Sequence, residues 1–128
     1  MKAIFVFLFV TSALFAEAIT LDNQTTYPTK QSKMAVQWAN TAREVDEENK
    51  SLMFEGKLDP TTLQTIPQIG KVTLKLPPKA QHFRILVWSN GSKIPDYTTN
   101  WIDITLNKTY TLENDYLIPV VLMTGSGC

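Results

Sequence analysis

The chain has 128 residues, of which 44% are hydrophobic and 19% are charged, and this suffices for one domain with one apolar core. Twelve Lys and Arg residues balance twelve Asp and Glu residues, so the formal net charge at pH 7 is zero. Nucleic acids and anionic membrane surfaces are bound through an excess or a stripe of basic residues, and the neutral balance argues against both classes of partner.

The N-terminal segment, residues 1–18, has the three parts of a secretory signal. Lys2 supplies a positive charge, an apolar stretch runs from Ala3 to Phe15, and the small-x-small triplet Ala16-Glu17-Ala18 follows. The apolar stretch is shorter than the ~20 residues that a membrane-spanning helix needs. We expect cleavage after Ala18, with Ala16 as the alternative, and a mature chain without a membrane span that is secreted to a periplasm or out of the cell.

Alternation of apolar and polar residues, the pattern of a half-buried β-strand, recurs along the mature chain. The clearest example is residues 71–76, where three apolar residues alternate with two lysines and a threonine. Shorter alternating runs predict further strands at residues 19–22, 34–39, 101–106 and 109–112.

Two other segments, residues 83–88 and 117–123, are apolar on both faces. The first is typical of a central strand that is covered on both sides, or of one whose second face meets a partner. Pro119 lies in the second segment and cannot donate a ladder hydrogen bond, which predicts a strand at the edge of a sheet.

Residues 41–54 break the alternation and predict a helix, because their apolar residues recur at helical spacing. Asn40 or Thr41 can cap its start, and Gly56 can close its end. Asp59-Pro60 is typical of the start of a second, single-turn helix, with Asp as the cap and Pro at the first helical position.

About seven short strands separated by turns, with one short helix in a crossover, predict a mainly β fold, a small antiparallel β-sandwich. Asn90-Gly91 is a tight-turn dipeptide, and Asn107-Lys108 is interpreted as a two-residue hairpin. An α+β sheet with the helix on one face is the alternative. The predicted organisation is a cleaved signal peptide at 1–18, a single β-rich domain at 19–123 and a flexible C-terminal tail at 124–128.

The sequence has no motif of a catalytic or metal-binding site. His82 is the only histidine, and no Gly-x-Ser-x-Gly turn or second histidine accompanies it. Asp96 and Asp103 remain as candidates for carboxylate-pair chemistry. The acidic residues at 44, 46, 47 and 48 lie on the predicted helix without the glycine of a calcium loop, and are interpreted as a solvated helix face. We therefore expect a protein that is not an enzyme, with no cofactor and no metal ligands.

Three aromatic residues, Trp101, Tyr97 and Trp88, are the candidate binding residues. Trp101 falls on the polar side of its alternating run, Tyr97 lies in the loop before it, and Trp88 occupies the second face of its strand. Exposed aromatic rings anchor protein partners and stack on sugar rings. The alternative is that these rings cover a neighbouring loop or pack under the helix.

Four of the seven asparagines begin an Asn-x-Ser/Thr sequence: Asn23, Asn49, Asn90 and Asn107. In a eukaryotic secretory pathway, this sequence is the acceptor for N-linked glycans. In a bacterium it has no such meaning, and the signal peptide does not decide between the two.

Cys128 is the only cysteine, so no intramolecular disulfide can form. An odd cysteine in a secreted chain suggests an intermolecular disulfide, and an incidental free thiol is the alternative. We interpret the chain as a secreted, non-enzymatic binding module for an unknown protein or glycan, either a monomer or a Cys128-linked dimer. The alternative is a structural or assembly component of the cell envelope that is linked through Cys128 or through the edge strand around Pro119.

Overall fold

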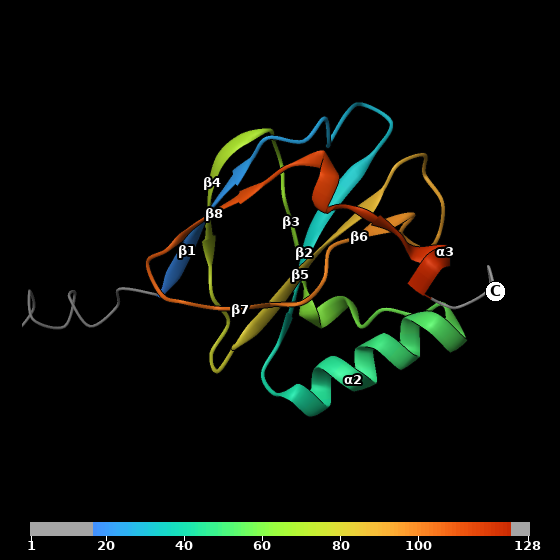
Figure 1. Cartoon of the computed structure of the whole chain (residues 1–128), viewed down its shortest axis with the longest axis horizontal. Coiled ribbons are helices and arrows are strands. Elements are labelled where there is room, and N and C mark those ends of the chain that lie inside the picture. The colour runs from blue at the N-terminus through green and yellow to red at the C-terminus, as the bar shows by residue number, and fades with distance from the viewer. Residues whose placement is uncertain (1–16, 124–128) are drawn as a thin grey trace, which may run out of the picture.

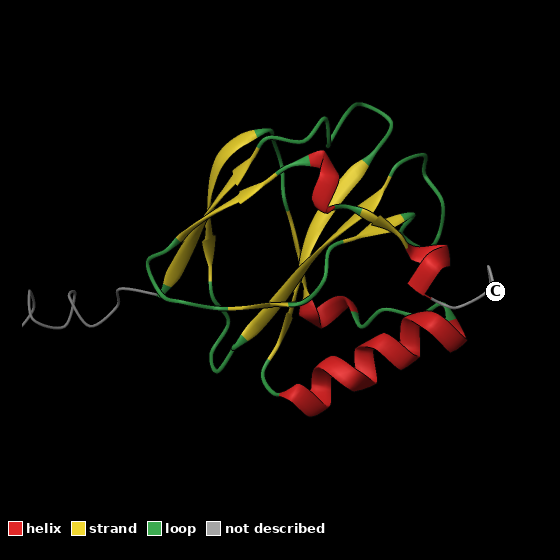
Figure 2. Ribbon diagram, in the orientation of Figure 1, coloured by secondary structure: helices red, strands yellow, loops and turns green. Residues whose placement is uncertain are grey.

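The fold is a small, mainly β sandwich with one short helix, as predicted (Figure 1). The computed structural model describes residues 17–123, and the side chains of 17–121. Most of the predicted signal segment, the tail at 124–128 and Cys128 lie outside the described residues. Two sheets of three and six strands pack face to face, and most of the helical residues lie outside the larger sheet (Figure 2).

The smaller sheet has the strand order β4-β1-β8. Strands β1 and β4 are antiparallel over their whole length, from the pair Ala18↔Lys75 to the pair Asn23↔Gly70. The sequence predicts an antiparallel sandwich. Strand β8, however, runs parallel to β1, so one pair of strands departs from that prediction. The bounds are β1 (Ala18–Asn23), β4 (Gly70–Lys75) and β8 (Thr109–Leu112).

The larger sheet has the order β3-β2-β5-β6-β9, with β7 also paired to β5. Its centre is the antiparallel ladder between β2 and β5, which extends from Lys33↔Trp88 to Ala39↔His82. The bounds are β2 (Lys33–Ala39), β3 (Leu63–Thr65), β5 (His82–Trp88), β6 (Tyr97–Thr98), β7 (Ile102–Asp103) and β9 (Ile118–Pro119).

Strand β5 is buried on both faces, as the sequence predicted. Phe83, Ile85 and Val87 point into the core between the sheets, together with residues from β1, β2 and β4. The intervening residues Arg84 and Leu86 lie on the outer face, and they are equally buried. An arginine at the centre of a buried face needs polar partners, and the helical segment that covers this face supplies some of them.

Helix α2 (Ala42–Lys50) begins where the sequence predicts, with the Thr41 hydroxyl accepting a hydrogen bond from the backbone N–H of Glu44 at 3.1 Å. It continues into a π-helical turn, η1 (Ser51–Glu55), which Gly56 closes with a left-handed φ of 62°. Asp59 caps the 3-10 turn η2 (Pro60–Thr62), also as predicted. Within residues 17–123, no helix is long and apolar enough to cross a membrane.

The predicted hairpin at Asn107-Lys108 is wrong. A turn is present, and Asn107 adopts the left-handed φ of 62°, but the strands on its two sides belong to different sheets. Strand β7 pairs with β5, whereas β8 pairs with β1. The turn therefore carries the chain from one layer of the sandwich to the other.

The last apolar run is a strand for only two residues. After the 3-10 turn η3 (Asn114–Tyr116), strand β9 occupies the edge of the larger sheet, as Pro119 predicted. The chain then turns into the short helix α3 (Val120–Met123) instead of extending the strand. This turn places Val120 and Val121 beside the end of the α2–η1 segment, where both line the same cavity.

Candidate functional site

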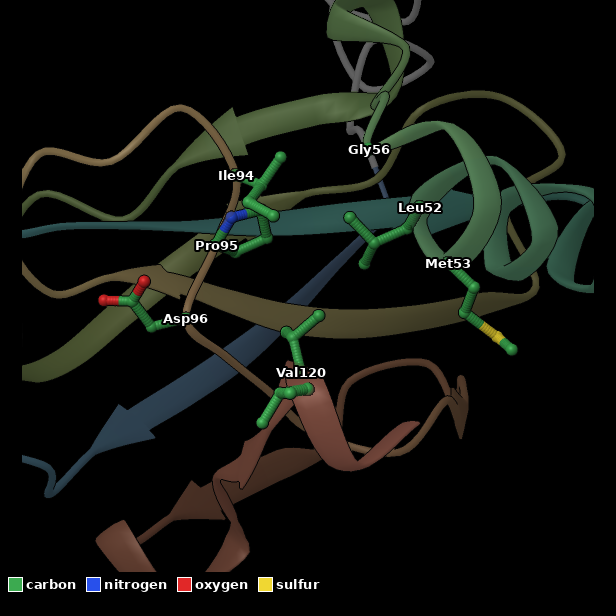
Figure 3. A pocket seen from close by; sticks show the side chains of 8 residues that line it. Leu52, Met53, Gly56, Ile94, Pro95, Asp96 and Val120 are labelled. Carbon is green, nitrogen blue, oxygen red and sulfur yellow. The ribbon is translucent and has the colours of Figure 1, made fainter. Parts of the chain in front are cut away.

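A cavity of about 460 Å³ opens between the π-helical turn, the β5–β6 connection and α3. We call it the apolar hollow. In Figure 3, the side chains of Leu52, Ile94 and Val120 come from these three segments and surround the same space. The lining is mostly apolar, and it consists of Leu52, Met53, Gly56, Ile94, Pro95, Asp96, Val120 and Val121.

The π-helical turn at the end of α2 sets one wall of the apolar hollow. Within this turn Leu52 is buried and Met53 is half-buried. The N–H of Gly56 donates to the carbonyl of Leu52 at 3.1 Å and closes the turn. A Cβ at Gly56 would lie 3.5 Å from Ile94 Cγ2, so the end of the helical segment is packed against the β5–β6 connection. π-Helical turns are rare and often occur at functional sites.

The other two walls are joined by a backbone hydrogen bond. The N–H of Val120 donates to the carbonyl of Asp96 at 2.9 Å. Pro95 and Val120 are buried, which fixes the floor of the apolar hollow. Ile94 and Val121, in contrast, are 42% and 56% exposed. The walls are therefore held in place by their backbone, while the side chains of Ile94 and Val121 remain open to solvent.

Phe54 adds a further exposed apolar side chain at this end of the molecule. It is 74% exposed and lies between Met53 and Gly56, which both line the apolar hollow. Leu52, Met53 and Phe54 are consecutive on a helical segment, so their side chains cannot all face the core. The triplet is a sequence signal for an exposed apolar surface, although its spacing alone predicts only a helix.

Among the described residues, Asp96 is the only ionisable one in the lining, and its carboxylate already accepts hydrogen bonds from its own loop. It accepts hydrogen bonds from the hydroxyl and N–H of Ser89 and from the hydroxyl of Ser92. The hydrogen bond from the Ser89 hydroxyl is the largest cause that lowers the pKa of Asp96 below its ordinary value. In Figure 3 the carboxylate points away from the other labelled side chains. It holds the loop that carries Ile94 and Pro95, and it offers no catalytic group to the cavity.

The position of the helical segment on the larger sheet depends on a buried polar cluster around Arg84. The guanidinium donates from Nε to Gln37 Oε1 at 2.8 Å and from Nη1 to Asn49 Oδ1 at 3.0 Å. Among the described residues, its Nη2 has no hydrogen-bond partner. Burial lowers the pKa of Arg84 to about 10, which leaves it charged at pH 7. Asn49, in the last turn of α2, thus ties the helix to strand β5.

Glu48 is the acidic member of this cluster. Its Oε1 accepts a hydrogen bond from Gln37 Nε2 at 2.9 Å, and the same amide group also donates to the hydroxyl of Thr62 at 3.1 Å. Burial is the largest cause that raises the pKa of Glu48 above its ordinary value. Glu48 therefore differs from the other acidic residues of the helix. Asp46 and Glu47 form exposed pairs with Lys50 and Arg43.

Trp101, the first predicted binding residue, belongs to the Arg84 cluster. Its ring centroid lies 4.6 Å from Arg84 Cζ, and its Nε1 donates to Asn49 Oδ1 at 2.9 Å. The side chain is half-buried. This is the alternative that the sequence left open, in which the ring packs under the helix.

Tyr97 and Trp88 lie in two further environments. Tyr97 packs against the core between the sheets, with its ring centroid 6.3 Å from that of Tyr27, and it lines a separate cavity of about 270 Å³. Trp88 is buried on the outer face, and its Nε1 donates to the carbonyl of Lys93 at 3.3 Å. The structure therefore does not bring the three predicted aromatic residues together into one surface.

The candidate catalytic residues are also dispersed. His82 begins β5, and its Nδ1 lies 2.8 Å from Asp103 Oδ1, whose side chain is 89% exposed. Asp96 sits near the other end of the strand, where its N–H donates to Val87. The five residue steps from His82 to Val87 span about 17 Å of strand, so the carboxylates of Asp96 and Asp103 do not form a pair. Among the described residues, no three His, Cys, Asp or Glu side chains are grouped to hold a metal ion.

The four Asn-x-Ser/Thr sequences are not equivalent in the fold. Asn23 is 1% exposed, and its Nδ2 donates to the carbonyls of Tyr27 and Gln68. The side chain of Asn49 is held by Arg84 and Trp101, as described above. Asn90 and Asn107 lie on exposed turns.

No family model, no curated protein and no solved structure matches this chain. A role for the apolar hollow must therefore come from its own chemistry. Its volume lies within the range of ligand-binding cavities, and an apolar lining with few polar groups is typical of such cavities. Cys128, the predicted residue for an intermolecular disulfide, lies outside the described residues.

Proposed function

We propose that this chain is an exported, non-enzymatic binding module, and that the apolar hollow receives an apolar side chain of a protein partner. The observation that carries the proposal is a preformed cavity of about 460 Å³ whose apolar walls are partly open to solvent. Burial of apolar surface is the main favourable contribution to association between proteins.

The chemistry of the lining supports binding over catalysis. Asp96 is the one ionisable residue there within the described part of the chain, and two serines already donate hydrogen bonds to its carboxylate. General acid-base or nucleophilic catalysis needs a titratable or nucleophilic group within reach of the substrate. A side chain that enters the apolar hollow meets mainly Leu52, Ile94 and Val120 instead.

The aromatic residues give less support to a glycan ligand. A stacked sugar needs an exposed ring face, but Trp88 is buried and one face of Trp101 lies against Arg84. Tyr97 lines a cavity together with Tyr27. Trp88 lines another, but there Lys33 Nζ lies 4.7 Å from its ring centroid and covers the ring. The geometry therefore favours a protein partner over a glycan.

Short peptides with one central Leu, Met or Phe among polar residues would test the proposal. In a two-dimensional NMR titration, we expect them to shift the signals of Met53, Ile94 and Val120, and an all-polar peptide to shift none. Ile94→Asp places a charge on the wall and should weaken binding at least about tenfold, the range of interface residues that contribute strongly. Ile69→Asp, at another exposed isoleucine, is the matched control and should bind like the wild type.

The titration should use the Cys128→Ser variant at low concentration, so that self-association does not compete with the peptide. Absence of shifts around the apolar hollow with every apolar peptide would disprove the proposal. Equal loss of binding in Ile94→Asp and Ile69→Asp would also do so, because the loss would then not be specific to this cavity.

A further inference from the structure

We infer that the free edge of strand β4 binds an extended segment of a protein partner as an additional β-strand, and that this segment carries acidic residues at alternate positions. The surface is separate from the apolar hollow, so the inference goes beyond the proposed function and does not depend on it. In Figure 1, strands β4, β1 and β8 lie on one side of the molecule, whereas α2 and α3 lie on the other.

Strand β4 is the longest edge strand within the described part of the chain. It forms one end of the smaller sheet and pairs only with β1, in a register without interruption. It has six residues, whereas the other edge strands, β8, β3, β9 and β7, have four, three, two and two. A long edge without proline or bulge is a template for pairing with another chain.

The ladder between β4 and β1 leaves alternate backbone groups of β4 unpaired. Just beyond the strand, the N–H of Leu76 donates to the carbonyl of Glu17. Hydrogen-bonded pairs alternate along an antiparallel ladder, so Leu74 and Val72 also bond to β1. The N–H and C=O groups of the other three residues point away from β1, and no hydrogen bond among the described residues uses them: Lys71, Thr73 and Lys75.

Two lysines give this edge a positive charge. The side chains of Lys71, Thr73 and Lys75 are exposed on the outer face of the sheet. Among the described residues, neither lysine forms an ion pair. Asp22 lies opposite Lys71 on β1, but its carboxylate accepts a hydrogen bond from Gln24 Nε2 at 3.1 Å. The edge therefore has two cationic side chains that an added strand can pair with.

A second copy of this chain does not fit the edge. If two β4 strands pair antiparallel about Thr73, each Lys71 lies opposite a Lys75, and like charges at opposed positions destabilise a sheet. Lysines on edge strands prevent such self-pairing. The same charges favour a strand with Asp or Glu at these positions, because specificity combines repulsion of one partner with attraction of another.

The register of β4 specifies the pattern of the added strand. In an antiparallel strand, three alternate residues lie on the outer face, opposite Lys75, Thr73 and Lys71. The two residues between them lie on the inner face, opposite Leu74 and Val72. Leu74 is buried in the core and Val72 packs against it, so the intervening residues should be apolar. Because Thr–Thr pairs also stabilise a ladder, the expected centre of the segment is of the type Glu-Val-Thr-Val-Glu.

Hydrogen exchange measured by NMR on the full mature chain tests the inference, with a peptide that carries Glu-Val-Thr-Val-Glu between serine and glycine residues. At ten times the Kd, about a tenth of the protein is free. We therefore expect the amides of Lys71, Thr73 and Lys75 to exchange about tenfold more slowly with the peptide. The amides of Met53 and Ile94, at the apolar hollow, should exchange at an unchanged rate.

Charge reversal tests the acidic pattern. A peptide with Lys in place of both Glu residues should bind at least about tenfold more weakly. The variant with Lys71→Glu and Lys75→Glu should reverse this preference. Lys30→Glu with Lys57→Glu reverses two exposed lysines outside β4; this matched control should keep the preference for the acidic peptide.

Methylation of the peptide backbone tests the strand geometry without altering the protein. The nitrogen of the central Thr faces β4, so its methylation should abolish binding, whereas methylation of a Val nitrogen, which faces away, should not. No binding of the acidic peptide, binding without slower exchange at the three amides, or equal binding of the acidic and basic peptides would overturn the inference.

Ile94→Asp, at the apolar hollow, separates the two proposals. It should bind the acidic peptide like the wild type, and a loss of binding would overturn the inference, because the peptide would then occupy the apolar hollow. If the edge of β4 binds no strand while apolar peptides still bind at the apolar hollow, the proposed function stands alone. If only the edge of β4 binds its peptide, this inference stands and the proposed role of the apolar hollow fails.

Discussion

The indole ring of Trp101 stacks on the guanidinium of Arg84, and both side chains donate a hydrogen bond to the same oxygen, Asn49 Oδ1. Asn49 belongs to α2, Arg84 to the central strand β5, and Trp101 to the segment just before β7. One amide oxygen therefore connects the helix to two parts of the larger sheet. Because α2 leads directly into η1, this connection also fixes the helical wall of the apolar hollow.

Arg84→Ala should destabilise the domain strongly. The change leaves Gln37 Oε1 without this donor, removes one of the two hydrogen bonds to Asn49 Oδ1 and opens a cavity, so we expect a loss of about 3 kcal/mol in the free energy of unfolding. Arg84→Met, which fills the space with an apolar chain, should cost less. Urea denaturation measures both. Arg43→Ala removes an exposed arginine whose side chain is 86% exposed, and should cost no more than about 0.5 kcal/mol. Equal losses at the two arginines would refute the role given to Arg84.

Glu48→Gln should change how stability depends on pH. The pKa of Glu48 is raised in the folded state above its ordinary value of 4.5, mainly by burial. Its contribution to stability is therefore fully present below pH 4.5 and is lost as the pH rises through the folded pKa. Glutamine removes the ionisation, so the variant should be more stable than the wild type at pH 7, and this advantage should disappear on acidification.

Urea denaturation at pH 4 and at pH 7 measures this difference. Glu47→Gln, which removes an exposed carboxylate from the same helix, is the control for a general effect of charge. A Glu48→Gln variant that is less stable than the wild type at pH 7 would show that the attraction between Glu48 and Arg84 outweighs the cost of burial.

Ser89→Ala should raise the pKa of Asp96 towards its ordinary value of 3.8. The hydrogen bond from the Ser89 hydroxyl is the largest cause of the lowered pKa, and the one from Ser92 is a smaller cause. The lowered pKa contributes stability above pH 3.8, and this contribution is lost as the pH falls through the folded pKa. Carboxyl-carbon NMR titration gives the pKa directly. Ser92→Ala is the matched control and should produce a smaller rise; a larger rise than that of Ser89→Ala would contradict the assignment.

The sequence predicted those parts of the fold that depend on local patterns. The alternation at residues 71–76 is visible because β4 has one more buried and one solvated face. The helix starts are also local, because Thr41 and Asp59 cap them through hydrogen bonds to residues two or three positions away. The parallel pairing of β1 with β8 was not predictable in this way, because it joins residues almost 90 positions apart.

The candidate site was missed for a related reason. The apolar hollow combines residues 52–56, 94–96 and 120–121, which no local pattern connects. Trp101 was assigned to an exposed face by extending one alternating strand over residues 101–106, whereas β7 contains only Ile102 and Asp103. With the strand so short, alternation no longer decides where Trp101 points, and its hydrogen bond to Asn49 does.

Only two of the four Asn-x-Ser/Thr sequences should carry glycans when the chain is exported through a eukaryotic secretory pathway. Asn90 and Asn107 are exposed, whereas the amide of Asn23 is buried and that of Asn49 is held by Arg84 and Trp101. A glycan on the buried amide of Asn23, or on the half-buried amide of Asn49, is incompatible with these contacts. Enzymatic deglycosylation in heavy-oxygen water followed by peptide mass spectrometry marks each occupied site. A folded, secreted protein with a glycan on Asn23 or Asn49 would contradict this prediction.

The point at which the signal peptide is cleaved should affect the stability of the smaller sheet. The carbonyl of Glu17 accepts a hydrogen bond from Leu76 N–H at 2.9 Å, and that of Ala18 accepts one from Asn107 N–H at 3.2 Å. A chain that begins at Ile19, after the predicted cleavage at Ala18, lacks both bonds. A chain that begins at Glu17 keeps both, and each bond contributes about 1 kcal/mol.

We therefore expect the longer mature chain to unfold at a higher urea concentration, with a free energy of unfolding about 1–2 kcal/mol greater. Two purified proteins that start at Glu17 and at Ile19 provide the comparison, with Glu17→Ala in the longer chain as the control. That variant keeps the backbone carbonyl and should retain the extra stability. If it loses the stability, the side chain of Glu17 is responsible; if the two chains are equally stable, neither hydrogen bond holds β1 in place.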